Sequence, residues 1–217
     1  MFGLSEFFVY LVVALLLTRV PLVGKYFRLL NTLIHEIGHA LMALITSGRV
    51  YNIQVFSDMS GVAYTGRSSW LGRVLTSLAG YPFASFVAFV YVLLIQMGHL
   101  NVVFYSLVGM LVVSLVLWVR NWFGFIWVTV FLVGTVGMYV YASTELMTMY
   151  VYLIIAVLLV EALWTACIVL YISFKTPKES GDCYNLSKST KIPAIFWGLF
   201  FVGQALYFFN LSYTYWL

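Results

Sequence analysis

The chain has 217 residues, of which 64% are hydrophobic and only 8% are charged. A soluble domain has about a quarter of its residues charged, so this composition excludes a soluble globular protein, a disordered chain and a coiled coil. The net charge of +4 is scattered, and no basic run could follow a nucleic-acid backbone, so we expect no nucleic-acid partner. The two cysteines, Cys167 and Cys183, form no CxxC pair and no disulfide framework. We therefore expect a multi-span protein whose surroundings are the membrane lipid bilayer.

Continuous apolar runs of about 20 residues predict membrane-spanning helices. The first run ends at Pro21 without a small-residue cleavage site, so it indicates a span and not a removable signal peptide. The third run contains Pro82, which predicts a kink or a strong tilt. The sequence thus predicts an all-α polytopic membrane protein with about seven transmembrane helices in a single domain, residues 1–217. The runs lie near 5–23, 26–47, 69–97, 100–119, 123–142, 149–172 and 192–216.

Two segments do not have the character of spans. Residues 48–67 alternate polar and apolar side chains on either side of the turn residues Asp58 to Gly61, which predicts a β-hairpin. Residues 173–191 contain four lysines and Pro177, and they predict a polar loop.

The lysines and arginines of the short loops predict the orientation in the membrane. Loops two, four and six hold eight of them, and the opposite set holds about three. This asymmetry places loops two, four and six in the cytoplasm, with the N-terminus inside and the C-terminus outside. We expect an integral multi-pass protein of the cell (plasma) membrane.

The second run contains His35-Glu36-Ile37-Gly38-His39, an HExxH motif. Positions i and i+4 share one face of a helix, so both imidazoles can bind one metal ion. Zinc lowers the pKa of a bound water to about 7, and Glu36, about 100° round the helix from His35, can take its proton. Three ionisable groups are costly within a membrane helix. This cost favours a functional site over a polar cluster that only fastens helices together.

The residues around this motif resemble the M50B-like branch of the site-2-protease (M50) metallopeptidases. Those are multi-span proteins with HExxH in a membrane helix, followed by a β-hairpin. The resemblance covers about residues 26–205 and implies a zinc metalloendopeptidase, with Zn²⁺ as cofactor, that cleaves a transmembrane protein substrate in or near the membrane. It also favours a hairpin at the mouth of the site, where an exposed edge can pair with an extended substrate. The matching blocks are residues 31–40, Gly48-Arg49-Val50, Ser60-Gly61-Val62, Ala79-Gly80-Tyr81, Arg120-Asn121-Trp122-Phe123-Gly124, Gly181-Asp182-Cys183, and Ile192-Pro193-Ala194 with Trp197.

Two departures from the family pattern keep a second function open. The Asp-Gly motif that supplies the third zinc ligand in well-studied site-2 proteases is missing, and residues 170–174 replace an acidic WDxxD-like stretch. The alternative is a catalytically silent M50-like membrane protein that binds a metal or membrane partners without cleaving them. A small transporter is less favoured, because the polar groups cluster on one helix and no broken-helix pair is visible.

A catalytic zinc site usually has three protein ligands, and three acids are candidates for the third. Asp58 lies in the predicted turn, where local hydrogen bonding explains an aspartate. Glu161 lies in mid-span, where a carboxylate must be protonated, paired or bound to a metal. Asp182 lies in the Gly-Asp-Cys block that resembles the family's Ser-Asp-Ala block, and Gly181 would let its loop fold back into the membrane. The predicted metal ligands are therefore His35, His39 and Asp182, with Glu161 as the alternative third ligand, and the predicted catalytic base is Glu36.

Small residues recur at four-residue spacing in the third run, a pattern that lets membrane helices pack closely. We expect Gly80 and Ala84 to meet the HExxH helix, because Gly38 is small as well. The alternative is that this ridge of small residues packs against a second copy of the chain in a homodimer. Its members are Ser68, Gly72, Thr76, Gly80, Ala84 and Ala88.

Overall fold

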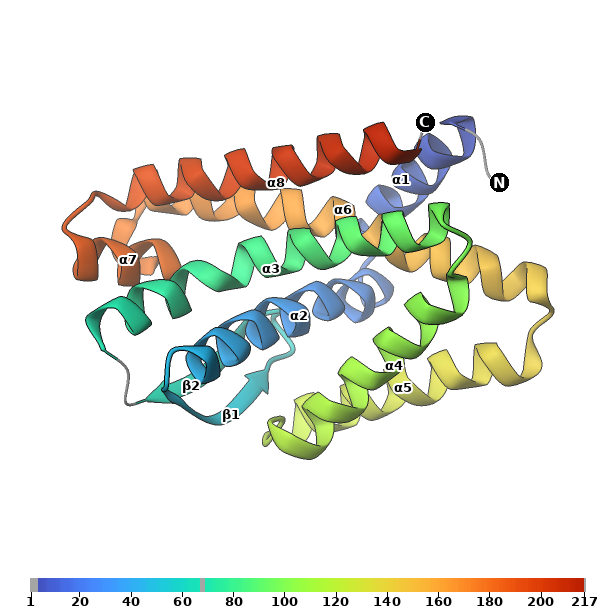
Figure 1. Ribbon diagram of the computed structural model, residues 1–217, viewed down its shortest axis with the longest axis horizontal. Helices are drawn as coiled ribbons and strands as arrows, with labels where there is room; N and C mark the ends of the chain where they lie inside the picture. Colours follow the sequence, from blue (N-terminus) through green and yellow to red (C-terminus); the bar gives the residue numbers. More distant parts are fainter. Residues whose placement is uncertain (1–3, 67–68, 217) are drawn as a thin grey trace.

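The computed structural model describes residues 4–66 and 69–216, which form a helical bundle with a small β-hairpin at one end (Figure 1). Helices α2, α3, α6 and α8 pack along one another, and α4 and α5 form a helical hairpin beside them. In chain order the elements are α1 (Leu4–Arg19), α2 (Val23–Ile45), β1 (Arg49–Val55), β2 (Gly61–Gly66), α3 (Trp70–Gln96), α4 (Leu100–Leu117), α5 (Trp122–Tyr141), α6 (Thr144–Lys175), the short 3₁₀ helix η1 (Pro177–Glu179), α7 (Asp182–Thr190) and α8 (Ala194–Trp216).

Five helices in the described part of the chain are long and apolar enough to cross a membrane: α3, α4, α5, α6 and α8. Helices α1 and α2 pass the same test only as a pair, bent by 107° at the break between them. The predicted count of seven spans is therefore not confirmed, since the structure supports five, or six with the bent pair as one span. The break contains Pro21 and Leu22, whose φ of 66° is incompatible with a continuing α-helix. No broken helix pair was expected here.

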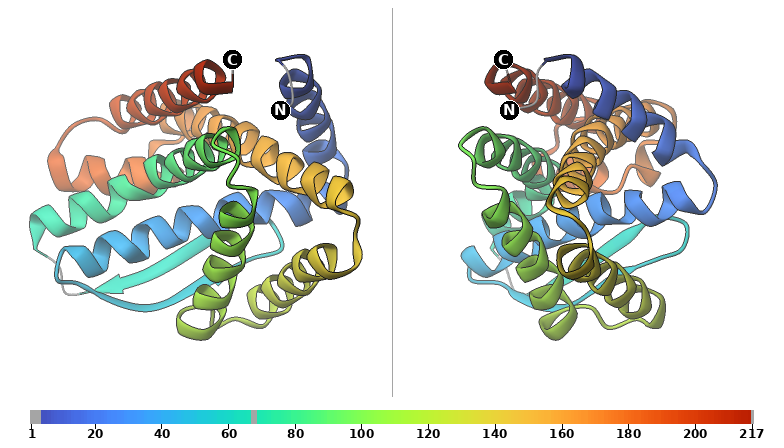
Figure 2. Two further views of the ribbon diagram at one scale, coloured as in Figure 1. Left: turned by 45° about the vertical axis from the view of Figure 1, so that its right-hand side comes forward. Right: turned by 90° about the vertical axis from the view of Figure 1, so that its right-hand side faces the viewer.

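The start of α1 and the end of α8 lie together, at the end of the bundle opposite the hairpin and α7 (Figures 1 and 2). The ring centroid of Phe7 in α1 lies 4.8 Å from that of Trp216 in α8. This arrangement follows if α1 and α2 cross the bundle once between them, because the described helices then make an even number of passes.

Helices α2 and α3 approach closely because small residues face one another. A Cβ atom on Gly80 would lie 2.5 Å from His35 Cε1, and one on Gly38 would lie 2.7 Å from Phe83 Cβ. Neither position has room for a side chain. The prediction that Gly80 meets the HExxH helix is thus confirmed. Ala84 is buried as well, and Ser68, the first member of the predicted ridge, lies outside the described residues.

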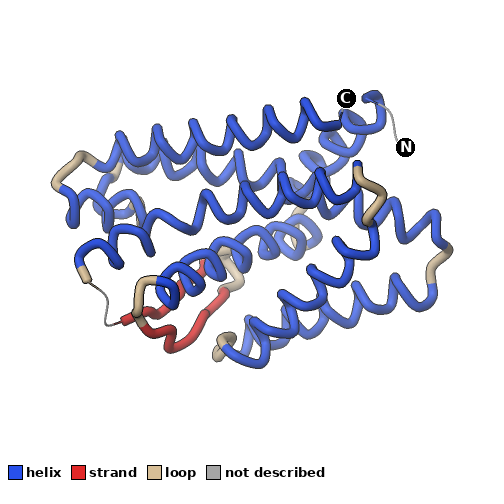
Figure 3. Tube along the Cα trace, viewed as in Figure 1, coloured by secondary structure: helices blue, strands red, loops and turns tan. Residues whose placement is uncertain are grey.

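The hairpin predicted at 48–67 is confirmed as the antiparallel pair β1 and β2 (Figure 3), with Arg67 outside the described residues. Ile53 and Val55 of β1 are fully buried and anchor the hairpin on the bundle. The alternation of buried and exposed side chains along β1 is the pattern expected of a half-buried strand.

The outer edge of β1 is covered by the segment that joins α4 to α5. The N–H of Ile53 donates to Trp118 O at 2.8 Å, and the N–H of Arg120 donates to Ile53 O at 3.2 Å. Asn121 extends this pairing with its side chain, because Nδ2 donates to Val55 O at 2.7 Å and Oδ1 accepts from the Val55 N–H at 3.2 Å. The open edge of the hairpin is therefore that of β2.

The polar segment 173–191, predicted as a loop, is instead largely helical. Helix α6 continues to Lys175, η1 follows, and α7 occupies Asp182–Thr190. Cys183 and Leu186 are fully buried, and they hold α7 on the bundle beside α3 and α8. These contacts are made with distant helices, which explains why the local sequence did not predict a helix.

Candidate metal centre

Three side chains from two distant parts of the chain meet at one point. His35 and His39 lie one turn apart on α2, and Asp182 is the first residue of α7. The two Nε2 atoms are 3.0 Å apart, and Asp182 Oδ2 lies 3.1 Å from each of them. Their ligand atoms all lie within 4.8 Å of one another. The structure thus brings together the three residues that were predicted as metal ligands.

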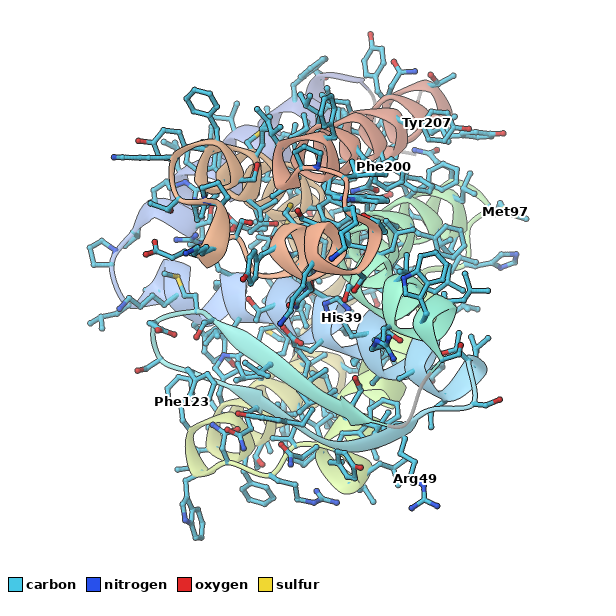
Figure 4. The ribbon with its side chains drawn as sticks, turned by 90° about the vertical axis from the view of Figure 1, so that its left-hand side faces the viewer. His39, Arg49, Met97, Phe123, Phe200 and Tyr207 are labelled. Carbon is cyan, nitrogen blue, oxygen red and sulfur yellow. The ribbon has the colours of Figure 1, made fainter. Side chains whose placement is uncertain are left out.

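A backbone carbonyl of α3 orients His39. Nδ1 of His39 lies 2.6 Å from Thr76 O. A carbonyl can only accept, so Nδ1 carries a proton and donates it, and Nε2 is the ring nitrogen that faces His35 and Asp182. His39 is buried, and Figure 4 shows it in the interior of the molecule, below α7.

Asp182 reaches the histidines because the chain turns sharply just before it. Gly181 has a φ of 54°, in the left-handed region that glycine adopts without strain. Burial by itself would raise the pKa of the Asp182 carboxyl, but the charges and hydrogen bonds of His39 and His35 outweigh burial and lower the pKa below its ordinary value. Asp182 is therefore an ionised carboxylate at neutral pH.

The donor set fits a zinc ion. Two imidazole nitrogens and one carboxylate oxygen are typical ligands of catalytic zinc, which leaves the fourth position for water. Ligands at about 2.0–2.1 Å from a tetrahedral zinc lie about 3.3 Å from one another. The three donor atoms found here are 3.0 and 3.1 Å apart. Because Nδ1 of His39 is engaged by Thr76 O, Nε2 is the nitrogen left to serve as a metal ligand, and it faces the other two donor atoms.

Glu36 lies beside the three predicted ligands and beneath the hairpin. Its side chain is buried, and its carboxylate accepts a hydrogen bond from the backbone N–H of Ala63 in β2. Gly61, at the start of β2, lies so close that a Cβ atom there would be 2.8 Å from Glu36 Oε1. The hairpin therefore fixes the position of the Glu36 carboxylate.

The three predicted metal ligands and Glu36 line one cleft of about 650 Å³. Its walls come from α2, the first half of α3, β2, the C-terminal part of α6, and α7. The β2 residues from Gly61 to Ala63 line it with Thr65, so the edge of the hairpin formed by β2 borders the space next to His35, His39 and Asp182. A cleft in which a few polar side chains converge is the usual form of a ligand or substrate site.

The other two acids weighed as ligands lie elsewhere. Glu161 is fully buried in α6 and forms ion pairs with Arg19, at 3.2 Å, and with Arg28, at 2.9 Å. A mid-span carboxylate was expected to be protonated, ion-paired or bound to a metal, and the structure shows Glu161 ion-paired. Asp58 accepts hydrogen bonds from the hydroxyl and the backbone N–H of Ser60, at 2.6 and 3.0 Å, as expected for a turn residue. These hydrogen bonds lower the pKa of Asp58.

No role in the site was assigned to Thr76 or Tyr81, and Asn121 was not linked to the hairpin. The Tyr81 ring lies against His35, with centroids 4.5 Å apart, and both residues line the cleft. A sequence signal existed for Tyr81 and Asn121, because each lies in one of the short blocks that resemble the M50B-like branch. Thr76 acts through its backbone carbonyl, which its side-chain identity does not reveal.

Comparison with protein families agrees with this architecture. The sequence matches the model of the family described as Peptidase M50B-like over residues 8–212. The match spans most of the chain, and the chain therefore belongs to the Peptidase M50B-like family. Comparisons with the curated proteins and with the solved structures found no match.

Proposed function

We propose that this multi-pass membrane protein is an intramembrane zinc metallopeptidase that hydrolyses a peptide bond in or near the membrane. The observation that supports this best is the convergence of His35, His39 and Asp182 next to Glu36 in one cleft. Membership of the M50B-like family and the apolar helices are consistent with it. The substrate would be a transmembrane protein.

In this proposal His35, His39 and Asp182 hold Zn²⁺, which would polarise the scissile carbonyl and acidify a water molecule. Glu36 is the general base: its carboxylate accepts the proton of the attacking water and returns a proton to the leaving amine. The Ala63 N–H keeps this carboxylate oriented toward the cleft. Tight burial under β2 limits the access of bulk water to it.

The edge of β2 can present the substrate. Ile53 gives both of its backbone groups to Trp118 and Arg120, so its register partner Ala63 directs its own N–H and C=O away from β1. The N–H donates to Glu36, so the C=O of Ala63 is the group that a substrate N–H could reach. An extended peptide could add to this edge as a further strand. A substrate helix must unwind first, because its carbonyls are otherwise engaged within the helix.

The direct test is cleavage of a transmembrane peptide by the purified protein in detergent, followed by mass spectrometry. Glu36→Gln should retain stoichiometric zinc but cleave about 10²–10⁴-fold more slowly, because it lacks the general base. Glu145→Gln, an exposed acid at the start of α6, is the matched control and should match the wild type in both respects. Undiminished cleavage by Glu36→Gln would refute the proposal. A wild type that holds zinc but cleaves no membrane peptide would favour the catalytically silent alternative.

We further propose that the protein lies in the plasma membrane, with the end that bears the hairpin and α7 in the cytoplasm. The basic residues Arg49 in β1, Lys188 in α7 and Arg120, whose N–H donates to Ile53 of β1, support that assignment. A cytoplasmic N-terminus, as predicted, requires α1 to cross the membrane on its own. If α1 and α2 form one bent span, the N-terminus lies on the opposite side, next to the C-terminus.

A further inference from the structure

Three charged side chains form a group at one end of the cleft, outside the metal centre. Glu161, fully buried in α6, accepts a hydrogen bond from Nε of Arg28 at 2.9 Å. Its other carboxylate oxygen lies 3.2 Å from Nη2 of Arg19. Two guanidinium groups share one carboxylate, so the group has two positive charges, one negative charge and a net charge of +1.

The two arginines occupy different surroundings. Arg19 lies over the ring of Trp164, with its Cζ atom 4.1 Å from the ring centroid, and it does not line the cleft. Arg28 does line the cleft, and 20% of its side chain is exposed. Arg19 is enough to neutralise Glu161, so the charge of Arg28 is in excess. The hydrogen bond from Nε holds the guanidinium in place, and this leaves the terminal amino groups available to a ligand.

No acid of the cleft neutralises this charge among the residues that the structure describes. Glu161 is the one described acid that forms an ion pair with Arg28. Asp58 and Glu179 also line the cleft, but neither forms an ion pair with Arg28, and Asp58 is hydrogen-bonded to Ser60. An excess cation within a membrane protein is costly without a counter-ion. An anion that enters this end of the cleft would therefore be bound favourably.

The position of Arg28 relates this charge to the proposed peptide. Arg28 precedes His35 by seven residues on α2, which corresponds to about 10 Å along the helix axis. The hairpin turn and the first half of β2 lie beside this part of α2, since Thr32 donates to Met59 O at 3.0 Å and Glu36 accepts from the Ala63 N–H. An extended peptide advances about 3.3 Å per residue. Arg28 therefore lies about three residues from the scissile bond, on the side of the hairpin turn.

We propose that Arg28 forms an anion subsite that binds a carboxylate of the peptide substrate. This inference rests on the proposed peptidase function for its class of ligand. Arginine suits the role because its planar guanidinium binds a carboxylate through two parallel hydrogen bonds. The carboxylate is supplied by an aspartate or glutamate side chain of the substrate or by a free C-terminus.

The test measures peptide binding to the zinc-loaded Glu36→Gln protein in detergent micelles, so that no peptide is cut. Fluorescent peptides of about ten residues, built from alanine and leucine, carry a single Glu at successive positions, and a second set carries Gln instead. Both sets are made with a free and with an amidated C-terminus. At one position the Glu peptide should bind about tenfold more tightly than its Gln partner, a typical effect of a hydrogen bond to a charged group. A tenfold loss on amidation would instead assign the subsite to the peptide C-terminus.

Matched arginine variants identify the residue responsible. Arg28→Gln should abolish the preference for the carboxylate, and Arg28→Lys should retain part of it. Arg19→Gln also deprives Glu161 of one arginine partner, but Arg19 does not line the cleft. This variant should therefore keep the preference for the carboxylate peptide. An unchanged preference in Arg28→Gln, or equal binding of all Glu and Gln peptides and of both C-terminal forms, would overturn the proposal. The peptide comparison decides the matter even if Arg28→Gln does not fold. A carboxylate preference without cleavage by the wild type would refute the peptidase function and leave the subsite standing.

Discussion

Gly80 determines whether both imidazoles fit between α2 and α3. A Cβ atom at this position would lie 2.5 Å from His35 Cε1 and 2.6 Å from His39 Nε2. We expect Gly80→Ala to displace the rings and to weaken zinc binding about 10–100-fold, as loss of ligand orientation does at other zinc sites. Competition with a chelator would measure this affinity. Gly137→Ala is the matched control, because a Cβ there would meet no atom within 4 Å among the described residues, apart from its chain neighbours and its own helix backbone. Equal zinc affinity in the two variants would contradict this explanation.

The residues of the site differed in how well the sequence could predict them. His35, Glu36 and His39 lie within one helical turn, so their spacing alone placed them on neighbouring faces. Asp182 lies 147 positions after His35, and its candidacy depended on the resemblance to a family block. The carbonyl of Thr76 could not be predicted, because every residue has one and only the packing of α3 selects it.

At the scale of elements, Asn121 holds the hairpin to the α4–α5 connection. Its amide group pairs with both backbone groups of Val55, and Val55 is the register partner of Gly61 next to Glu36. Asn121→Ala should lower the local stability of the hairpin by about 1–3 kcal/mol, since it leaves buried backbone groups unpaired. Hydrogen–deuterium exchange of residues 49–55 would detect faster opening. The exposed Asn101 of α4 provides the control Asn101→Ala. Unchanged protection of β1 in Asn121→Ala would disprove this role.

The hairpin and α7 show which elements a sequence can predict. Alternating side chains around a turn are a local pattern, and they correctly predicted β1 and β2. Helix α7 has nine residues, too few for a stable isolated helix in water. Its stability comes from Cys183 and Leu186 packed against distant helices. The pairing of Ile53 with residues 118–120 is equally non-local, so it was not predicted.

At the scale of the whole molecule, the packing of α1 against α8 leads to a topology that can be tested. Phe7 contacts Trp216, and α1 and α2 pass the test for a span only as a bent pair. We expect reporters fused to the N-terminus and to the C-terminus to lie on the same side of the membrane. A reporter inserted in the hairpin turn should lie on the other side. Termini on opposite sides of the membrane would contradict this topology and support the seven separate spans predicted from the sequence.

Composition alone predicted a membrane protein, because too few charged residues are present to cover a water-exposed surface. The number of spans was harder to predict. Apolar runs indicate which segments avoid water, but they do not distinguish two crossings from one bent crossing. The difference depends on the backbone at Pro21 and Leu22 and on Gly24, where a Cβ atom would lie 2.5 Å from Thr18 O.

The metal content of the purified protein tests the central claim most directly. The wild type should hold stoichiometric zinc, because two imidazoles and an ionised carboxylate converge on one point. Asp182→Ala should lose most of this zinc, whereas Asp58→Ala, which removes an acid of the hairpin turn, should keep it. A wild type that neither contains nor takes up zinc, or an Asp182→Ala protein that holds zinc as firmly as the wild type, would contradict the account.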